Sequence, residues 1–212
     1  ALSNLRSNIP RDCMPYVVTT YDAFLKHEGT CQALAPQTVL RFGAQPVSKF
    51  LMQFLAKYSE HYIVIDESPL FRDSYAVATQ IVHATIGDWV QQFDASAIDS
   101  AYIELWQQVQ QITLNEIANY KAYSIDEGAY VQQLLQSVNN ANIFASSSMP
   151  IRDIDTFLAP TTKNIQIIAN RGTNGIDGVV STAFGYSVAS DLQTYLLIGD
   201  LATLHDMSGL LA

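Results

Sequence analysis

Three glycines are spaced three residues apart in the stretch Asn170 to Gly178, directly after an apolar run, residues 165–169, that is typical of a strand. Glycines at positions 172, 175 and 178 would let the backbone approach a ligand closely, and ligands of α/β proteins bind where parallel strands end. The spacing differs from the G-x-G-x-x-G dinucleotide fingerprint, and no acidic ribose partner ends the next strand. By itself, the stretch is equally compatible with a binding loop and with a structural turn.

A carboxylate follows the next apolar strand, residues 194–198, in the pair Gly199-Asp200. One interpretation makes Asp200 the N-cap of a helix, since a negative side chain is favourable there. The other makes Asp200 a ligand of Mg²⁺, which prefers one or two carboxylates together with phosphate oxygens. The N–H groups at the start of the helix would then help to bind a diphosphate. The residues alone leave both interpretations open.

Two arginines are placed to bind an anionic substrate in a chain that is acidic overall, with a formal net charge of −9 and an isoelectric point near 4.7. Arg152 and Arg171 each follow a predicted strand, 142–145 or 165–169, and Arg152 lies four residues beyond Ser148. Because parallel strands end at the same edge of a sheet, the two arginines could grip a carboxylate bidentately. Ion pairs with neighbouring aspartates are an equally compatible alternative: Asp153 or Asp155 for Arg152, and Asp177 for Arg171.

Composition and spacing argue against several classes of protein. The eleven Lys and Arg residues do not cluster, so nucleic acid is not an expected partner. Cys13 and Cys31 stand in no known motif and the four histidines show no ligand spacing, so neither a disulfide framework nor a zinc site is indicated. No apolar run is long enough to span a bilayer, and the amino-terminal stretch lacks the layout of a signal peptide. A cytoplasmic protein is expected.

Strand-like and helix-like segments alternate along the chain, which predicts an α/β fold with a parallel sheet. In the first part, strands are expected at 38–42, 62–65 and 78–84, and helices at 48–58, 86–93, 96–122 and 127–138, the last of them capped by Asp126. The inner face of the long helix is expected to consist of Tyr102, Leu105, Val109, Ile112 and Ile117. The glutamine-rich stretches within these helices are expected to be solvated faces.

A change of composition at Ser146 to Pro150 predicts a domain boundary, with one domain at 1–145 and a second at 146–212. The second part is expected to contain helix 151–158, strand 165–169, helix 177–188, strand 194–198 and a further helix from Gly199.

The two ends predict a piece of a longer protein, because the chain opens at Ala1 without an initiator methionine and closes on the apolar run Gly209 to Ala212. If later strands are missing, the edge at residues 195–198 is unpaired, and loose self-association through that edge is expected.

Together these segments resemble the 2-succinyl-5-enolpyruvyl-6-hydroxy-3-cyclohexene-1-carboxylate synthases of menaquinone biosynthesis, a family of thiamine-diphosphate-dependent enzymes. The matching segments are Thr38–Gly43 with Pro46–Lys49, Ser146–Asp153, Asn170–Gly178, and Ile198–Leu201 with His205–Asp206. Gly199-Asp200-Leu201 stands where the superfamily usually has Gly-Asp-Gly. This departure resembles the synthase branch and counts against acetolactate synthase and pyruvate decarboxylase.

The resemblance implies a three-domain enzyme in which residues 1–145 form most of a Rossmann-like central domain and residues 146–212 begin the diphosphate-binding domain. The glutamate that activates the cofactor, and the Asn-containing half of the metal motif, would lie outside these 212 residues, so the chain alone is expected to be inactive. The implied reaction decarboxylates 2-oxoglutarate on thiamine diphosphate and adds the succinyl carbanion to isochorismate. The full-length enzyme would be a homodimer or homotetramer.

The resemblance also implies roles for individual residues, all by position in the matching segments. Substrate carboxylates would be held by Ser148, Arg152 and Arg171, with Lys49 reaching isochorismate from the central domain. The cofactor would contact Ile176, Gly199, Asp200 and Leu201, and Asp200 would bind Mg²⁺ or Mn²⁺.

Two rival hypotheses remain. A nucleotide-binding or regulatory module is the first, although the missing G-x-G-x-x-G speaks against it. The second is a thiamine-diphosphate decarboxylase of another 2-oxo acid. Arg152 and Arg171 distinguish this case, because a dicarboxylic donor needs a cation for its far carboxylate and pyruvate does not.

Overall fold

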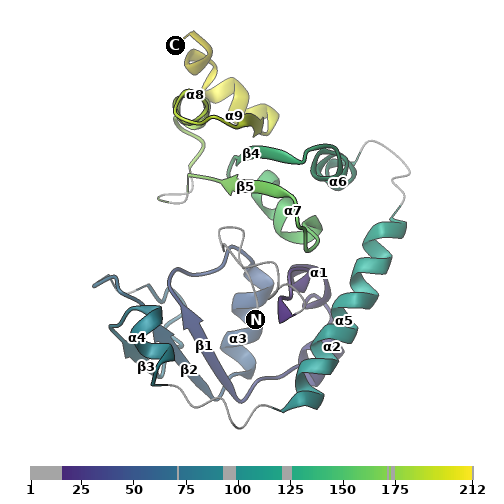
Figure 1. Ribbon diagram of the computed structural model, residues 1–212, viewed down its shortest axis with the longest axis vertical. Helices are drawn as coiled ribbons and strands as arrows, with labels where there is room; N and C mark the ends of the chain where they lie inside the picture. Colours follow the sequence, from purple (N-terminus) through teal and green to yellow (C-terminus); the bar gives the residue numbers. More distant parts are fainter. Residues whose placement is uncertain are drawn as a thin grey trace. The chain divides into compact units, whose positions relative to one another are not determined.

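The computed structural model describes residues 16–70, 72–92, 99–120, 126–170, 172 and 175–211. The chain divides into two compact units (Figure 1). One unit is Tyr21–Thr113, and the other joins Ala1–Thr20 to Leu114–Ala212. Each unit contains a parallel sheet of three strands, which confirms the predicted α/β class.

The sheet of the Tyr21–Thr113 unit has the strand order β1-β2-β3. Its strands are β1 (Thr38–Phe42), β2 (His61–Ile65) and β3 (Gln80–Val82). All pairs are parallel, with Phe42 opposite Ile65 and Ile65 opposite Val82. The first two predicted strands are therefore confirmed to within one residue, and the run at 78–84 contains a strand of only three residues.

Helices precede, connect and follow these strands, and the parallel pair β1 and β2 needs the helical crossover between them. They are α1 (Tyr21–Phe24), α2 (Glu28–Ala33), α3 (Lys49–Tyr58), α4 (Ile86–Val90) and α5 (Ser100–Asn119), of which α5 continues into the other unit. Helix α3 is the crossover from β1 to β2 and buries Leu51, Met52, Phe54 and Leu55. No helix in the described part of the chain is long and apolar enough to cross a membrane.

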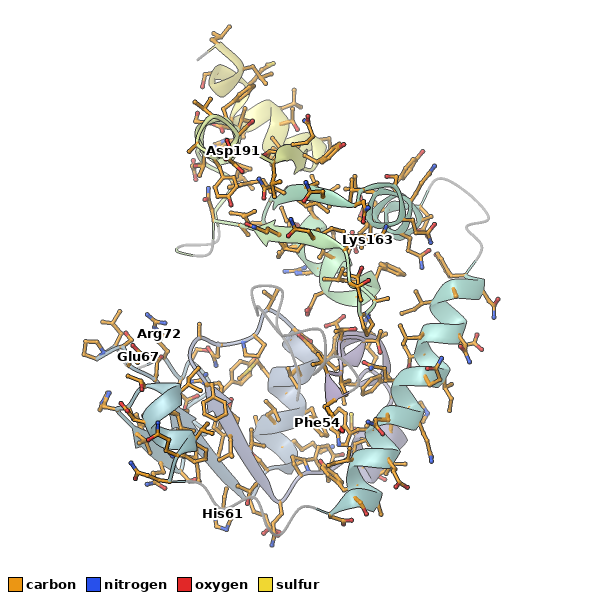
Figure 2. All side chains as sticks on the ribbon, in the orientation of Figure 1. Phe54, His61, Glu67, Arg72, Lys163 and Asp191 are labelled. Atoms are coloured by element: carbon orange, nitrogen blue, oxygen red, sulfur yellow. The ribbon has the colours of Figure 1, made fainter. Side chains whose placement is uncertain are left out.

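An aromatic cluster around Trp106 of α5 completes this core. The Trp106 ring lies 5.8 Å from that of Phe24 and 6.0 Å from that of Phe54, both in edge-to-face geometry (Phe54 is labelled in Figure 2). The predicted inner face is wrong at Ile112, which is 63% exposed. Gln110, one turn beyond Trp106, is buried although it was expected in a solvated face. The large indole ring of Trp106 lies on the buried face of α5. Gln110 lies on the same face because it is four residues further along the helix.

The sheet of the second unit has the strand order β5-β4-β6. Its strands are β4 (Asn140–Ala145), β5 (Asn164–Ile168) and β6 (Gln193–Leu197), and both pairings are parallel. The five residues from Ala141 to Ala145 are buried, as expected of a central strand. β6 pairs only with β4 in the described sheet, so the expected edge strand is observed, and self-association through it stays a prediction.

The helices of this unit follow the predicted order. They are α6 (Glu127–Ser137), α7 (Met149–Phe157), α8 (Val179–Val188), α9 (Asp200–His205) and the 3-10 helix η2 (Met207–Leu211). Asp126 caps α6 as predicted, accepting a hydrogen bond from the Ala129 N–H at 3.2 Å.

The predicted division after residue 145 falls inside this unit. β4 ends at Ala145, and both of its partners, β5 and β6, come later in the sequence. A cut at that point would separate the central strand from both neighbours. The boundary between family domains stays a prediction, whereas the compact units divide at residues 20 and 113.

Candidate active-site edge of the second sheet

The carboxyl ends of β4, β5 and β6 meet at one edge of the second sheet, because the three strands are parallel (β4 and β5 are labelled in Figure 1). Phe144 of β4 lies opposite Ile168 of β5, and Ala145 lies opposite Leu197 of β6. The segments that follow these residues are Ser146–Ser148, the Gly-rich turn from Asn170, and Gly199-Asp200. The topology thus brings together the three predicted site segments of this unit, as ligand sites of open α/β sheets require.

Ser148 adopts a backbone conformation that non-glycine residues rarely adopt. Its φ is 75° and its ψ is −130°, at the N-cap of α7, and its side chain makes no capping hydrogen bond. A residue in such a region costs on the order of 1–3 kcal/mol, and strain of this kind is concentrated at functional sites. The turn exposes Ser148 between a buried strand and a helix.

The two serines before Ser148 are buried: Ser146 is 1% exposed and Ser147 is 8% exposed. The Ser146 N–H donates to the Leu197 carbonyl at 2.9 Å, which extends the pairing of β4 with β6 by one residue. The hydroxyls of both serines are enclosed without a hydrogen-bond partner among the described residues. Sequence reasoning assigned these two serines no role, because nothing in their residue type predicts burial.

Arg152 lies on α7 one turn beyond Ser148, and its side chain is exposed. Ile151 and Ile154 anchor the opposite face of the helix at 3% and 0% exposure. Within the described ranges, Arg152 forms no ion pair, so the alternative pairing with Asp153 or Asp155 is not observed. Both aspartates are instead buried. The second predicted arginine, Arg171, lies outside the described residues.

The Gly-rich turn leads into α8 through Gly178, which is the N-cap and has a φ of 65°. A left-handed backbone of this kind favours glycine. Two contacts from the end of α9 hold this junction: His205 Nε2 lies 2.7 Å from Asp177 Oδ1, and Asp206 Oδ2 accepts the Val180 N–H at 2.7 Å. Ile176 lies directly before the junction and is half-buried.

Asp200 is the first residue of α9, and the N-cap is Gly199, whose φ of −77° and ψ of 161° are extended. The N-cap interpretation of Asp200 is therefore wrong. Its Oδ1 accepts the Leu201 N–H at 2.8 Å, and both side chains are exposed.

A magnesium ion would fit the donor set at Asp200. No group of three His, Cys, Asp or Glu side chains within the described ranges could hold a metal ion by itself. Mg²⁺ uses one or two carboxylates when phosphate oxygens and water complete its coordination, and one exposed carboxylate is present at Asp200.

Lys49 belongs to the other compact unit. It is the first residue of α3, is exposed, and follows the N-cap Ser48, whose Oγ accepts the Leu51 N–H at 3.1 Å. The first turn of α3 contains no acidic residue. A lysine is unfavourable by a few tenths of a kcal/mol at the positive end of a helix, so the dipole does not explain this placement.

Parallel sheets with helical crossovers define an α/β protein, and polar segments gathered where strands end are typical of the α/β proteins that bind ligands there. Comparison with known families narrows this class of protein. The family model described as "Middle domain of thiamine pyrophosphate", from the thiamine pyrophosphate (TPP) enzymes, matches residues 2–145. The chain therefore belongs to the family of TPP enzyme middle domains.

Three similar proteins share one name, 2-succinyl-5-enolpyruvyl-6-hydroxy-3-cyclohexene-1-carboxylate synthase. The protein from Lysinibacillus sphaericus is 52% identical over 216 residues, covering 100% of this chain and 38% of the relative. The protein from Listeria innocua is 39% identical over 220 residues, covering 99% of this chain and 37% of the relative. The protein from Bacillus pumilus is 37% identical over 217 residues, covering 100% of this chain and 37% of the relative. The chain thus spans less than two fifths of the length of these relatives.

Proposed function

We propose that these 212 residues are part of a synthase that decarboxylates 2-oxoglutarate and joins the remaining succinyl group to isochorismate in menaquinone biosynthesis. In this reaction the bond to the 1-carboxyl group of 2-oxoglutarate breaks with release of CO₂, and a carbon–carbon bond to the ring of isochorismate forms as one ring double bond is consumed and a proton is taken up. The 52% identity over the whole chain supports this assignment. The observation that carries it is the strained Ser148 where the central strand ends, with Arg152, which forms no ion pair with a described residue, one turn away.

Ser148 and Arg152 would bind a substrate carboxylate, together with Arg171. A guanidinium offers two parallel N–H donors to a carboxylate, and Arg152 has no competing ion pair among the described residues. The strained turn points to a backbone held in place for the ligand. A dicarboxylic donor such as 2-oxoglutarate needs a cation of this kind, and pyruvate does not.

Thiamine diphosphate, when bound, supplies the stabilisation of negative charge that decarboxylation of a 2-oxo acid requires. Asp200 would hold the Mg²⁺ or Mn²⁺ ion that binds the diphosphate, and the backbone at Gly199 and Leu201 would border it. Ile176 would support the cofactor from the Gly-rich turn. Lys49 would bind a carboxylate of isochorismate. We further propose that the enzyme is a cytoplasmic homodimer or homotetramer and that the 212 residues alone are inactive.

The test uses the full-length protein that carries this chain, supplied with thiamine diphosphate and Mg²⁺. Product formation from 2-oxoglutarate and isochorismate is followed by mass spectrometry, with pyruvate as the alternative donor. We expect turnover with 2-oxoglutarate, and a loss in kcat/KM of about 10- to 100-fold in Arg152→Ala, the effect of losing a hydrogen bond to a charged group. Arg152→Lys keeps the charge and loses the bidentate geometry, so its kcat/KM should lie between those of wild type and Arg152→Ala. Preference for pyruvate, or full activity of Arg152→Ala, would contradict the proposal.

A further inference from the structure

We propose that Asp22 is a positioning residue for Lys49, acting through the buried N-cap Ser48. The inference rests on the proposed function, in which Lys49 binds isochorismate. The geometry behind it lies entirely within the Tyr21–Thr113 unit.

The first link joins α1 to the start of α3. The Ser48 hydroxyl donates to Asp22 Oδ1 at 2.5 Å and accepts the Leu51 N–H at 3.1 Å. Ser48 is 3% exposed and Asp22 is 8% exposed, so the link is shielded from water. A charge-assisted hydrogen bond in such surroundings is short and strong.

The second link involves Phe50, the residue that follows Lys49 in the sequence. The Lys26 ammonium lies 3.5 Å from Asp22 Oδ2 and 5.2 Å from the centroid of the Phe50 ring. Cations at this distance from an aromatic face are attracted to it. Asp22 and Lys26 thus contact both sequence neighbours of Lys49, one through the Ser48 hydroxyl and the other through the Phe50 ring.

Helix capping alone does not require Asp22. Ser48 satisfies the Leu51 N–H by itself, and that contact is the ordinary N-cap interaction. The additional buried carboxylate has a desolvation cost, which a cap does not need. The Asp22 link instead determines how the first turn of α3 is held against α1. Because Lys49 is the first residue of that turn, the link sets the direction in which its long side chain leaves the helix.

The test measures steady-state kinetics of the full-length enzyme with each substrate varied separately. Asp22→Ala should raise KM for isochorismate by roughly 10-fold, because a misplacement of about 1 Å costs about 100-fold at a reacting site and a smaller shift of a binding group costs less. kcat and KM for 2-oxoglutarate should stay within about 2-fold of the wild-type values. Asp22→Asn keeps an acceptor for Ser48 and should recover most of the lost affinity. Asp126→Ala, which removes a carboxylate cap from α6 in the other unit, is the matched control for a general loss of stability.

A double-mutant cycle separates positioning from ordinary destabilisation. If Asp22 acts through Lys49, the double variant has the same KM for isochorismate as Lys49→Ala alone. If the two residues act independently, the fold-changes of the single variants multiply in the double variant. If Asp22→Ala does not fold, the same cycle is run with Ser48→Ala, which removes the hydroxyl through which Asp22 acts. The inference is overturned if Lys49→Ala raises KM for isochorismate while the variant that breaks the Asp22–Ser48 link leaves KM unchanged, or if the effects in the cycle multiply. If Lys49→Ala itself has no effect, the role of Lys49 in the proposed function fails instead.

Discussion

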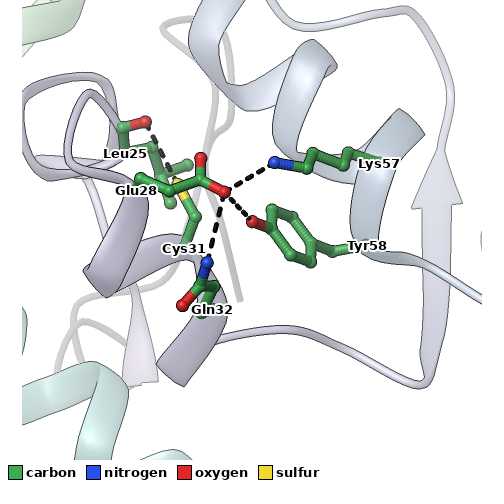
Figure 3. A network of polar contacts seen from close by, with 6 residues as sticks. All are labelled: Leu25, Glu28, Cys31, Gln32, Lys57 and Tyr58. Atoms are coloured by element: carbon green, nitrogen blue, oxygen red, sulfur yellow. Dashed lines mark hydrogen bonds and ion pairs between the residues drawn. The ribbon is translucent and has the colours of Figure 1, made fainter.

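Glu28 of α2 and Lys57 of α3 form an ion pair in which the Lys57 ammonium donates to Glu28 Oε1 at 2.6 Å (Figure 3). The Tyr58 hydroxyl donates to the same oxygen at 2.6 Å, and the Gln32 amide does so at 3.4 Å. This network joins the two helices next to Cys31, whose buried thiol donates to the Leu25 carbonyl at 3.2 Å. Burial raises the pKa of the Cys31 thiol, which disfavours the thiolate form.

The network predicts acid sensitivity. Hydrogen bonds from Lys57 and then Tyr58 lower the pKa of the Glu28 carboxyl from 4.5 to about 2. A lowered pKa contributes stability that is fully present above pH 4.5 and is lost as the pH falls toward 2. We expect the free energy of unfolding of wild type and Glu28→Gln to differ at pH 7 and to converge near pH 2, measured by urea denaturation. Glu67→Gln removes another exposed carboxylate and controls for net charge. A constant difference across this range would contradict the prediction.

Gly128 of α6 packs directly against Phe157 of α7. A Cβ atom at Gly128 would lie 2.4 Å and 2.5 Å from two carbons of the Phe157 ring. We expect Gly128→Ala to destabilise the fold by about 1–3 kcal/mol, the usual cost of overpacking a core. Gly87→Ala in α4, where the nearest atom is the Thr85 Oγ1 at 3.8 Å, is the matched control and should be neutral or slightly stabilising. Urea denaturation measures both, and partial recovery in Gly128→Ala with Phe157→Leu would identify the ring as the cause.

Lys163 caps the carboxyl end of α6 from the start of the β5 segment (Figure 2). Its ammonium donates to the Leu135 carbonyl at 2.9 Å and to the Gln136 carbonyl at 2.7 Å. A cation at this end of a helix is favourable, so Lys163→Met should cost roughly 1 kcal/mol in thermal or urea unfolding. Lys163→Arg should keep most of that stability. Equal stability of wild type and Lys163→Met would show that water satisfies these carbonyls equally well.

Local patterns predicted most of the elements. β1 and β2 were predicted to within one residue, and Asp126 was recognised as a helix cap, because each depends on side chains a few positions apart. Parallel pairing also followed, since strands alternating with helices leave little choice of topology. The site segments after β4, β5 and β6 could be predicted on the same basis.

Contacts between distant residues decided what the pattern did not predict. Trp106 rather than Ile112 faces the core, because the Trp106 ring packs against the rings of Phe24 and Phe54. Gly199 rather than Asp200 became the N-cap of α9, since the extended backbone that ends β6 continues through it. Neither outcome depends on local propensity alone.

The sequence by itself therefore determined the α/β class, the order of elements and the edge of the second sheet at which its candidate residues lie. Only the tertiary structure decided the positive φ of Ser148, the burial of the two serines before it and the link from Asp22 to Ser48. Ser48 and Asp22 are 26 residues apart in the chain. The physical reason is that periodicity encodes which face of an element is apolar, whereas a buried polar contact depends on which elements the whole core brings together.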